Sequence, residues 1–120
     1  MKIFCLLLLL LCSMNSMSQE KIPFEIRDGH FYRYGETTPI LSGEMHYARI
    51  PHQYWRHRLQ MMKGMGLNAV ATYVFWNLHE VEPGKWDFSG DKNLAEYIRI
   101  AGEEGMMVAA EYTRYGNKEG

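Results

Sequence analysis

The chain has 120 residues, enough for one small domain, and its 47% hydrophobic and 22% charged residues are ordinary for a globular protein. Its 13 Lys and Arg balance 14 Asp and Glu, so no positive excess is present to bind a phosphate backbone, and we expect no nucleic-acid partner. Both cysteines, Cys5 and Cys12, lie in an apolar N-terminal segment. We therefore expect no disulfide or thiolate chemistry in the rest of the chain.

The N-terminal segment has the layout of an export signal. Lys2 supplies a positive charge, and Ser16 and Ser18 are small residues suited to cleavage. The apolar run around Leu6–Leu11 is too short to cross a ~30 Å hydrocarbon core. We expect residues 1–18 to be a secretory signal peptide, with no integral membrane span, and the product to be secreted or periplasmic. A lipoprotein attached through Cys12 is the less favoured alternative, because leucine rather than a small residue precedes it.

The next residues predict a β-hairpin and then a strand. Residues 24–27 and 31–34 are rich in β-formers, and Asp28-Gly29 between them suits a turn in which both residues have positive φ. Residues 40–47 follow, and we interpret them as a strand that leads into a functional loop.

Two helices and two further strands are expected beyond residue 50. Pro51 suits the start of a helix that ends before Gly66, and its apolar stripe is Trp55, Leu59, Met62 and Met65. Residues 68–75 predict a strand buried on both faces, and residues 77–90 a loop with a Pro-Gly turn. Asp91 is expected to cap a helix that ends at Gly105, with the stripe Leu94, Tyr97, Ile98 and Ala101. Residues 106–110 predict a third strand.

Alternating strands and helices indicate an α/β fold with parallel strands. No glycine-rich phosphate-binding motif follows the first strand. Polar and aromatic residues gather instead at the carboxyl ends of the first two strands, where active sites of (β/α)8 barrels are built. These residues are Glu44, His46, Tyr47, Tyr73, Trp76, Asn77, His79 and Glu80. Aromatic rings beside hydrogen-bonding side chains suit a sugar.

Five motifs follow one another between residues 42 and 90. They are Ser42–Pro51 (SGEMHYARIP), Tyr54-Trp55, Lys63–Asn68 (KGMGLN), Thr72–Glu80 (TYVFWNLHE) and Pro83–Gly90 (PGKWDFSG). In this order and spacing they resemble the opening of a glycoside hydrolase family 35 β-galactosidase. The resemblance runs from about residue 24 to residue 108, and Val81 departs from it by standing where the family usually has proline.

The resemblance implies the N-terminal part, about three β/α units, of a TIM (β/α)8 barrel preceded by a β-hairpin. We therefore expect residues 19–120 to be part of the family's catalytic domain. The family removes terminal β-galactosyl residues with retention, using glutamates at the ends of the fourth and seventh strands. We expect both glutamates to lie beyond Gly120. From about residue 109 we expect the tail to depart from the family, and Glu111 echoes a galactose-binding glutamate but arrives too early along the chain.

Tyr73 is the residue we expect to bind substrate, because the resemblance matches it to a tyrosine that hydrogen-bonds galactose. A buried strand tyrosine with a satisfied hydroxyl is the alternative. Candidate residues of the pocket wall, which also suit a role in holding the loop, are Trp76, Asn77, His79 and Glu80. Glu44 and His46 fit either the pocket or a hydrogen-bonded pair behind it.

We expect no metal and no cofactor. Three histidines come at spacings that match no standard zinc pattern, namely His46, His52 and His57. The two carboxylates of a hydrolytic pair must face one substrate from separate strands. We therefore do not expect such a pair from the neighbouring glutamates Glu80 with Glu82, or Glu103 with Glu104.

The function expected from these residues is glycoside hydrolysis of the β-galactosidase type, with a β-galactoside as partner and no activity of these 120 residues alone. The alternative is a secreted, non-catalytic galactose-binding module. A third interpretation pairs this chain with a separately encoded remainder. The sequence indicates no oligomeric state and no linkage or aglycone preference.

Overall fold

The computed structural model describes residues 22–113, and its contacts divide the chain into two units, Met1–Pro39 and Ile40–Gly120. The predicted signal peptide, residues 1–18, lies outside the described residues. Within residues 22–113, no helix is both long enough and apolar enough to cross a bilayer.

The first unit is a small antiparallel sheet with the strand order β1-β2-β3. Strands β1 (Phe24–Arg27) and β2 (His30–Arg33) form the predicted hairpin, and both turn residues have positive φ, 51° at Asp28 and 75° at Gly29. A second tight turn leads into β3 (Glu36–Thr37), which the sequence analysis did not predict.

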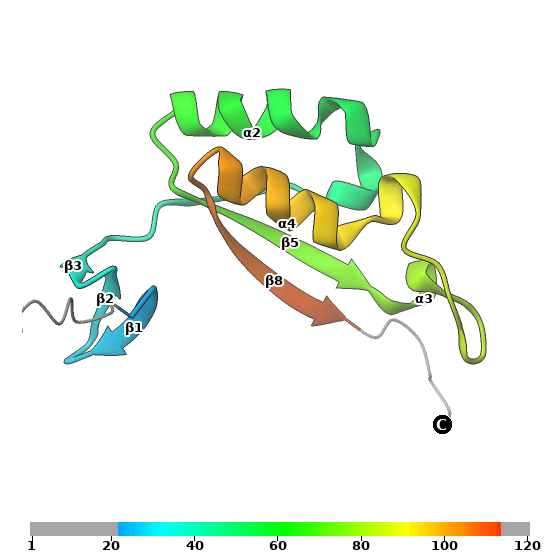
Figure 1. The fold of residues 1–120 in the computed structure, drawn as a ribbon, viewed down its shortest axis with the longest axis horizontal. Helices are drawn as coiled ribbons and strands as arrows, with labels where there is room; N and C mark the ends of the chain where they lie inside the picture. Colours follow the sequence, from blue (N-terminus) through cyan, green and yellow to red (C-terminus); the bar gives the residue numbers. More distant parts are fainter. Residues whose placement is uncertain (1–21, 114–120) are drawn as a thin grey trace, which may run out of the picture. The chain divides into compact units, whose positions relative to one another are not determined.

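The second unit is built on a parallel sheet with the strand order β4-β5-β8. Its strands are β4 (Ser42–Glu44), β5 (Ala69–Phe75) and β8 (Met107–Thr113). Helix α2 (Trp55–Gly64) connects β4 to β5, and helix α4 (Leu94–Glu103) connects β5 to β8. Both helices lie on the same face of the sheet (Figure 1). The predicted order of alternating strands and helices and the α/β class are confirmed.

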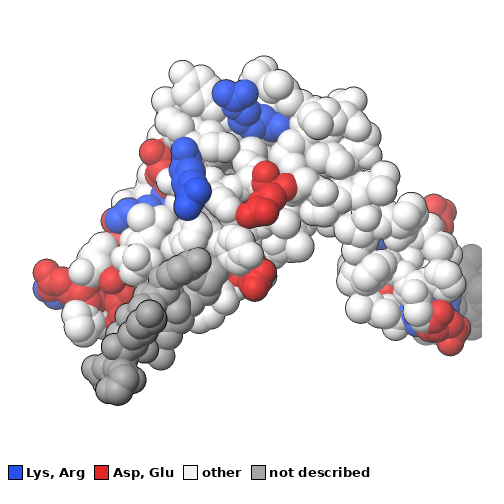
Figure 2. All heavy atoms as spheres, turned by 180° about the vertical axis from the view of Figure 1, so that it is seen from behind, with Lys and Arg blue, Asp and Glu red and all other residues white. Residues whose placement is uncertain are grey.

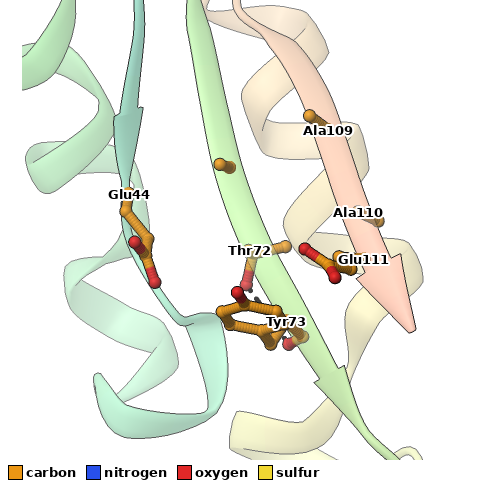
Figure 3. A pocket seen from close by; sticks show the side chains of 7 residues that line it. Glu44, Thr72, Tyr73, Ala109, Ala110 and Glu111 are labelled. Atoms are coloured by element: carbon orange, nitrogen blue, oxygen red, sulfur yellow. Dashed lines mark hydrogen bonds between the residues drawn. The ribbon is translucent and has the colours of Figure 1, made fainter. Parts of the chain in front are cut away.

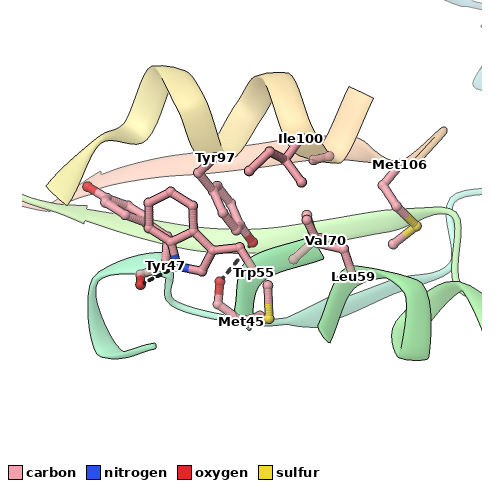
Figure 4. Close-up of a cluster of buried hydrophobic side chains, with 9 residues drawn as sticks. Met45, Tyr47, Trp55, Leu59, Val70, Tyr97, Ile100 and Met106 are labelled. Atoms are coloured by element: carbon pink, nitrogen blue, oxygen red, sulfur yellow. Dashed lines mark hydrogen bonds between the residues drawn. The ribbon is translucent and has the colours of Figure 1, made fainter. Parts of the chain in front are cut away.

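The core of this unit fills the space between the helices and the sheet (Figure 4). Trp55 is fully buried, and its indole N–H donates to the carbonyl oxygens of Tyr47 at 3.0 Å and Ile50 at 2.9 Å. The buried Tyr97 hydroxyl donates to the carbonyl oxygen of Met45 at 3.2 Å. These bonds join both helices to the segment after β4, in which the 3-10 turns Tyr47–Arg49 and His52–Tyr54 lead into α2.

The carboxyl ends of both helices follow the predicted pattern, but both starts differ from it. Helix α2 begins at Trp55, after the 3-10 turn His52–Tyr54, rather than at Pro51. Gly66 and Gly105 have φ of 90° and 74° just beyond α2 and α4, as the predicted ends require. The cap of α4 is Asn93, whose side chain accepts a hydrogen bond from the Glu96 N–H at 3.0 Å, so the prediction of Asp91 as cap is wrong. The chain makes a 3-10 turn at Gly90–Lys92 before the helix, which moves the cap two residues onward.

Two residues of the predicted apolar stripes are exposed. Met65 follows the last turn of α2 and is 77% exposed, and Ile98 is 42% exposed while Ile100 is buried. The stripe of α4 is therefore rotated, because Tyr97, Ile100 and Ala101 face the sheet.

The segment after β5 is more ordered than the predicted loop. A helical turn α3 (Trp76–His79) leads into a hairpin of β6 (Glu80–Glu82) and β7 (Lys85–Trp86). Strand β5 is buried at Val70 and Thr72 beneath the helices, while Ala71 and Tyr73 are half-buried on the other face. The prediction that this strand is buried on both faces is therefore only partly right in the described structure.

Acidic and basic side chains are interspersed over the surface, as Figure 2 shows for the side opposite to Figure 1. On the helices, the Arg56 guanidinium donates to carboxylates of Glu103 and Glu104, both at 2.5 Å, and so ties α2 to α4. This mixed distribution agrees with the small net charge of −1.

Candidate functional site

The candidate site lies on the face of the β4-β5-β8 sheet that the helices leave open (Figure 3). A cavity of about 170 Å³ on this face is lined by Glu44, Ala71, Thr72, Tyr73, Ala109, Ala110 and Glu111. The register explains this grouping, because Glu44 pairs with Ala71 and Tyr73 pairs with Glu111 across parallel strands. Alanines on β5 and β8 leave the hollow, and larger side chains toward the carboxyl ends form its rim.

Tyr73 is the predicted substrate-binding residue that the structure places in this cavity. Its ring lies between Glu44 and Glu111 (Figure 3). The ring packs against His46, with centroids 5.2 Å apart, and against Phe75 at 6.1 Å. The residue is half-buried, so one part of the side chain is held by neighbours while another part faces the cavity.

Glu44 and His46 form a pair beside Tyr73. The His46 Nε2 atom lies 2.7 Å from a carboxylate oxygen of Glu44, and the His46 Nδ1 atom accepts the backbone N–H of Tyr73 at 3.2 Å. Glu44 also lines the cavity. Of the two predicted alternatives, a place in the pocket or a pair behind it, Glu44 shows both, because it lines the cavity and pairs with His46.

His79 is buried rather than open to the cavity. It is 1% exposed, its Nδ1 lies 3.0 Å from the carbonyl oxygen of Asp87, and its Nε2 contacts the hydroxyl of Tyr47. A carbonyl can only accept, so Nδ1 carries the hydrogen and the Tyr47 hydroxyl donates to Nε2. Burial raises the pKa of Tyr47 to about 12, which keeps this hydroxyl protonated. His79 therefore ties the segment after β5 to the segment after β4.

The other three candidate wall residues lie in the same segment but do not line the cavity. The Trp76 ring contacts Trp86 at 4.4 Å between centroids and Tyr112 at 5.5 Å. A Glu80 carboxylate oxygen accepts the Gly84 N–H at 2.8 Å and so closes the β6–β7 hairpin. Asn77 is exposed on α3. Contact of these residues with a sugar remains a prediction.

Glu111 lines the cavity although it was not among the predicted site residues. It lies on β8, two residues before the strand ends, and is paired with Tyr73 in the register. Alternate residues of a strand lie on the same face of a sheet. Glu111, two residues after Ala109, could therefore have been placed on the same face as Tyr73 from the sequence of β8. The prediction for Glu111 rested instead on a motif that lies farther along the family's chains.

Among the described residues, no three His, Cys, Asp or Glu side chains lie close enough together to hold a metal ion. The three histidines considered above are engaged separately or lie apart. His46 contacts Glu44, His52 contacts Asp91, and His57 is exposed on α2.

The fold is similar to that of a solved endocellulase. An endocellulase from Pyrococcus horikoshii, solved with cellotetraose, superposes with a TM-score of 0.51 and 24% sequence identity over 80% of this chain and 32% of the endocellulase. At this identity the likeness concerns the fold alone.

The sequence has closer relatives. It is 40% identical over 95 residues to a β-galactosidase of Bos taurus, covering 79% of this chain and 14% of the relative. It is 46% identical over 86 residues to the human β-galactosidase-1-like protein 3, covering 72% of this chain and 13% of the relative. The chain thus spans a small part of the length of the curated relatives that it matches.

A family model also matches most of the chain. The model described as "Glycosyl hydrolases family 35" matches residues 30–119. This range includes the tail after Val108, in which the sequence analysis expected a departure from the family. The motifs around β4 and β5 fall inside the same range. The resemblance noted from the motifs is therefore confirmed, and the chain belongs to glycosyl hydrolases family 35.

Proposed function

We propose that this chain supplies part of the sugar-binding wall of a β-galactosidase-type glycosidase, with Tyr73 as the residue that contacts the terminal galactosyl group. The observation that carries the proposal is the cavity on the open face of the sheet, in which Tyr73 lies between two carboxylates. A phenol flanked by acidic side chains offers a sugar both a ring and several hydrogen-bonding atoms.

The three parallel strands are, in this proposal, the first three strands of a TIM barrel. The helices cover one face of the sheet, and Glu44, Tyr73 and Glu111 lie near the carboxyl ends of the strands on the other face. Barrel enzymes carry their active sites at this end. The cavity of about 170 Å³ is smaller than the ~300 Å³ at which ligand pockets usually begin. Further barrel strands would supply the missing walls.

The proposed chemistry is hydrolysis with retention, which needs a nucleophile and an acid/base about 5–5.5 Å apart. The family resemblance assigns these two glutamates to the fourth and seventh barrel strands. Within residues 22–113, the parallel sheet supplies three such strands, β4, β5 and β8. We therefore expect the chain by itself to bind a galactosyl group without cleaving it.

A galactose-binding module without catalysis is the second candidate, and the same cavity supports it. The two proposals differ in what happens when the rest of a family barrel is added. In the first, a polypeptide carrying the remaining strands restores hydrolysis in the presence of this chain. In the second, it does not.

Binding and turnover of the 120-residue chain test the proposal together. We expect galactose to shift the NMR signals of Tyr73. Tyr73→Phe should weaken galactose binding about tenfold, which corresponds to the loss of one hydrogen bond. An aryl β-galactoside should remain intact in the presence of the chain. Tyr54→Phe is the matched control, because Tyr54 is 52% exposed on a 3-10 turn. Absence of galactose binding would refute the proposed role of Tyr73. Hydrolysis that Tyr73→Phe abolishes would show that catalysis needs no further strands.

A further inference from the structure

The backbone of Tyr73 extends beyond the end of the neighbouring strand. Strand β4 pairs with β5 from Ser42 to Glu44, and the last backbone bond between the two segments joins the Met45 N–H to the carbonyl of Ala71 at 2.9 Å. Alternate residues of a strand direct their backbone groups to the same side. The N–H of Tyr73, two residues after Ala71, therefore points toward β4 where that strand has already ended.

His46 takes the place of the missing strand. Its Nδ1 atom accepts the Tyr73 N–H at 3.2 Å, although the two residues are 27 positions apart in the sequence. An accepting Nδ1 carries no hydrogen, so the neutral ring must carry its hydrogen on Nε2. The carboxylate of Glu44, 2.7 Å from Nε2, accepts that hydrogen and selects this tautomer.

Packing holds the His46 ring in the orientation that these two bonds require. The side chain is 17% exposed. It contacts Phe75 edge-on, with centroids 5.6 Å apart, and Tyr73 at 5.2 Å. The Glu44 side chain is 59% exposed and lines the cavity. The Glu44 carboxylate, the His46 ring and the Tyr73 N–H are therefore linked by hydrogen bonds that run from the cavity surface to the backbone.

We infer that Glu44 and His46 are positioning residues that fix the backbone of Tyr73 and thereby set the ring of Tyr73 in the sugar-binding cavity. This inference rests on the proposed function of Tyr73. His46 acts through Tyr73 and not by touching the sugar. Glu44 has a second role in this inference. His46 orients its carboxylate, whose remaining acceptor positions then face the same cavity.

Amide hydrogen exchange of Tyr73, followed by NMR on the full chain, tests the positioning without a sugar. His46→Leu removes the acceptor, and we expect exchange at Tyr73 to speed up about tenfold or more. His46→Gln keeps a side-chain acceptor and should restore part of the protection. Glu44→Leu leaves the imidazole free to change tautomer and should give an intermediate effect. His57→Leu, at an exposed position of α2, is the matched control and should leave the rate unchanged.

Galactose affinity is the second measurement that tests the inference. We expect about tenfold weaker binding in His46→Leu and partial recovery in His46→Gln, with the exchange of core amides such as Val70 unchanged in both. Equal Tyr73 exchange in wild type and His46→Leu would overturn the inference. If His46→Leu unfolds, the comparison between Glu44→Leu and wild type decides in the same way, since Glu44 is mostly exposed. A wild-type chain that binds no galactose would refute the proposed function, whereas the exchange rates would still decide whether the pair holds Tyr73.

Discussion

Replacing Tyr47 with phenylalanine should destabilise the second unit more than its single lost oxygen suggests. Tyr47 is fully buried and His79 is 1% exposed, and the Tyr47 hydroxyl is the donor to His79 Nε2. The phenylalanine ring fills nearly the same volume, so the contacts with Trp55 and Tyr97 remain. The loss is then one hydrogen bond together with a buried nitrogen left without a donor, about 1–3 kcal/mol.

Urea unfolding followed by tryptophan fluorescence measures this effect, because Trp55 lies in the same core. We expect a lower midpoint with an unchanged slope. Tyr54→Phe is the control, since this tyrosine is 52% exposed and its change should stay within about 0.5 kcal/mol. If Tyr47→Phe and Tyr54→Phe unfold at the same urea concentration, the buried hydroxyl contributes nothing and the assigned donor is wrong.

The same substitution changes the response to alkali. Burial raises the pKa of Tyr47 from 10.0 to about 12, and burial also raises the pKa of Tyr97. The unfolded chain therefore loses these phenol protons at lower pH than the folded chain. Stability from the protonated phenols is complete below pH 10 and is lost as pH rises toward 12. In Tyr47→Phe, stability should therefore fall less steeply with rising pH than in the wild type. Urea midpoints measured between pH 9 and about 11 test this difference.

Three further predictions concern the helix cap, acid stability and export. Asn93→Ala removes the side-chain cap of α4 and should lower the free energy of unfolding in urea by about 1 kcal/mol. The control Gln53→Ala, at an exposed position, should have little effect. Equal effects of the two substitutions would show that Asn93 does not stabilise the helix. Hydrogen bonding by Lys92 lowers the pKa of Asp87, so the stability that this carboxylate contributes is present above its unfolded pKa of about 3.9 and is lost as pH falls further. Asp87→Asn should therefore flatten the acid side of the stability curve, and an unchanged curve would contradict this account. Mass spectrometry of exported protein should find a chain that begins at residue 19, whereas a lipid on Cys12 would favour the lipoprotein alternative.

Local sequence rules were sufficient where a single interaction decides the structure. Asp28-Gly29 predicts the first turn because both positions need positive φ, and Gly66 and Gly105 predict helix ends for the same reason. The stripe through Trp55 and Leu59 predicts the buried face of α2, because residues three or four apart lie on one side of a helix. These features depend on neighbours in the chain, which the sequence displays directly.

Tertiary contacts decided one helix cap and the contacts on which the proposed site depends. The cap of α4 moved from Asp91 to Asn93 because the Asp91 carboxylate accepts hydrogen bonds from the backbone and ring of His52 on another turn. The link from Glu44 through His46 to Tyr73 exists only because β4 ends before β5, so an imidazole meets a backbone N–H that no strand covers. The sequence determined the family and the order of the main alternating strands and helices, and it supplied the hypothesis that Tyr73 contacts the substrate. Which polar side chain meets which backbone group was decided by strand register and strand length, since these bring together residues far apart in the chain.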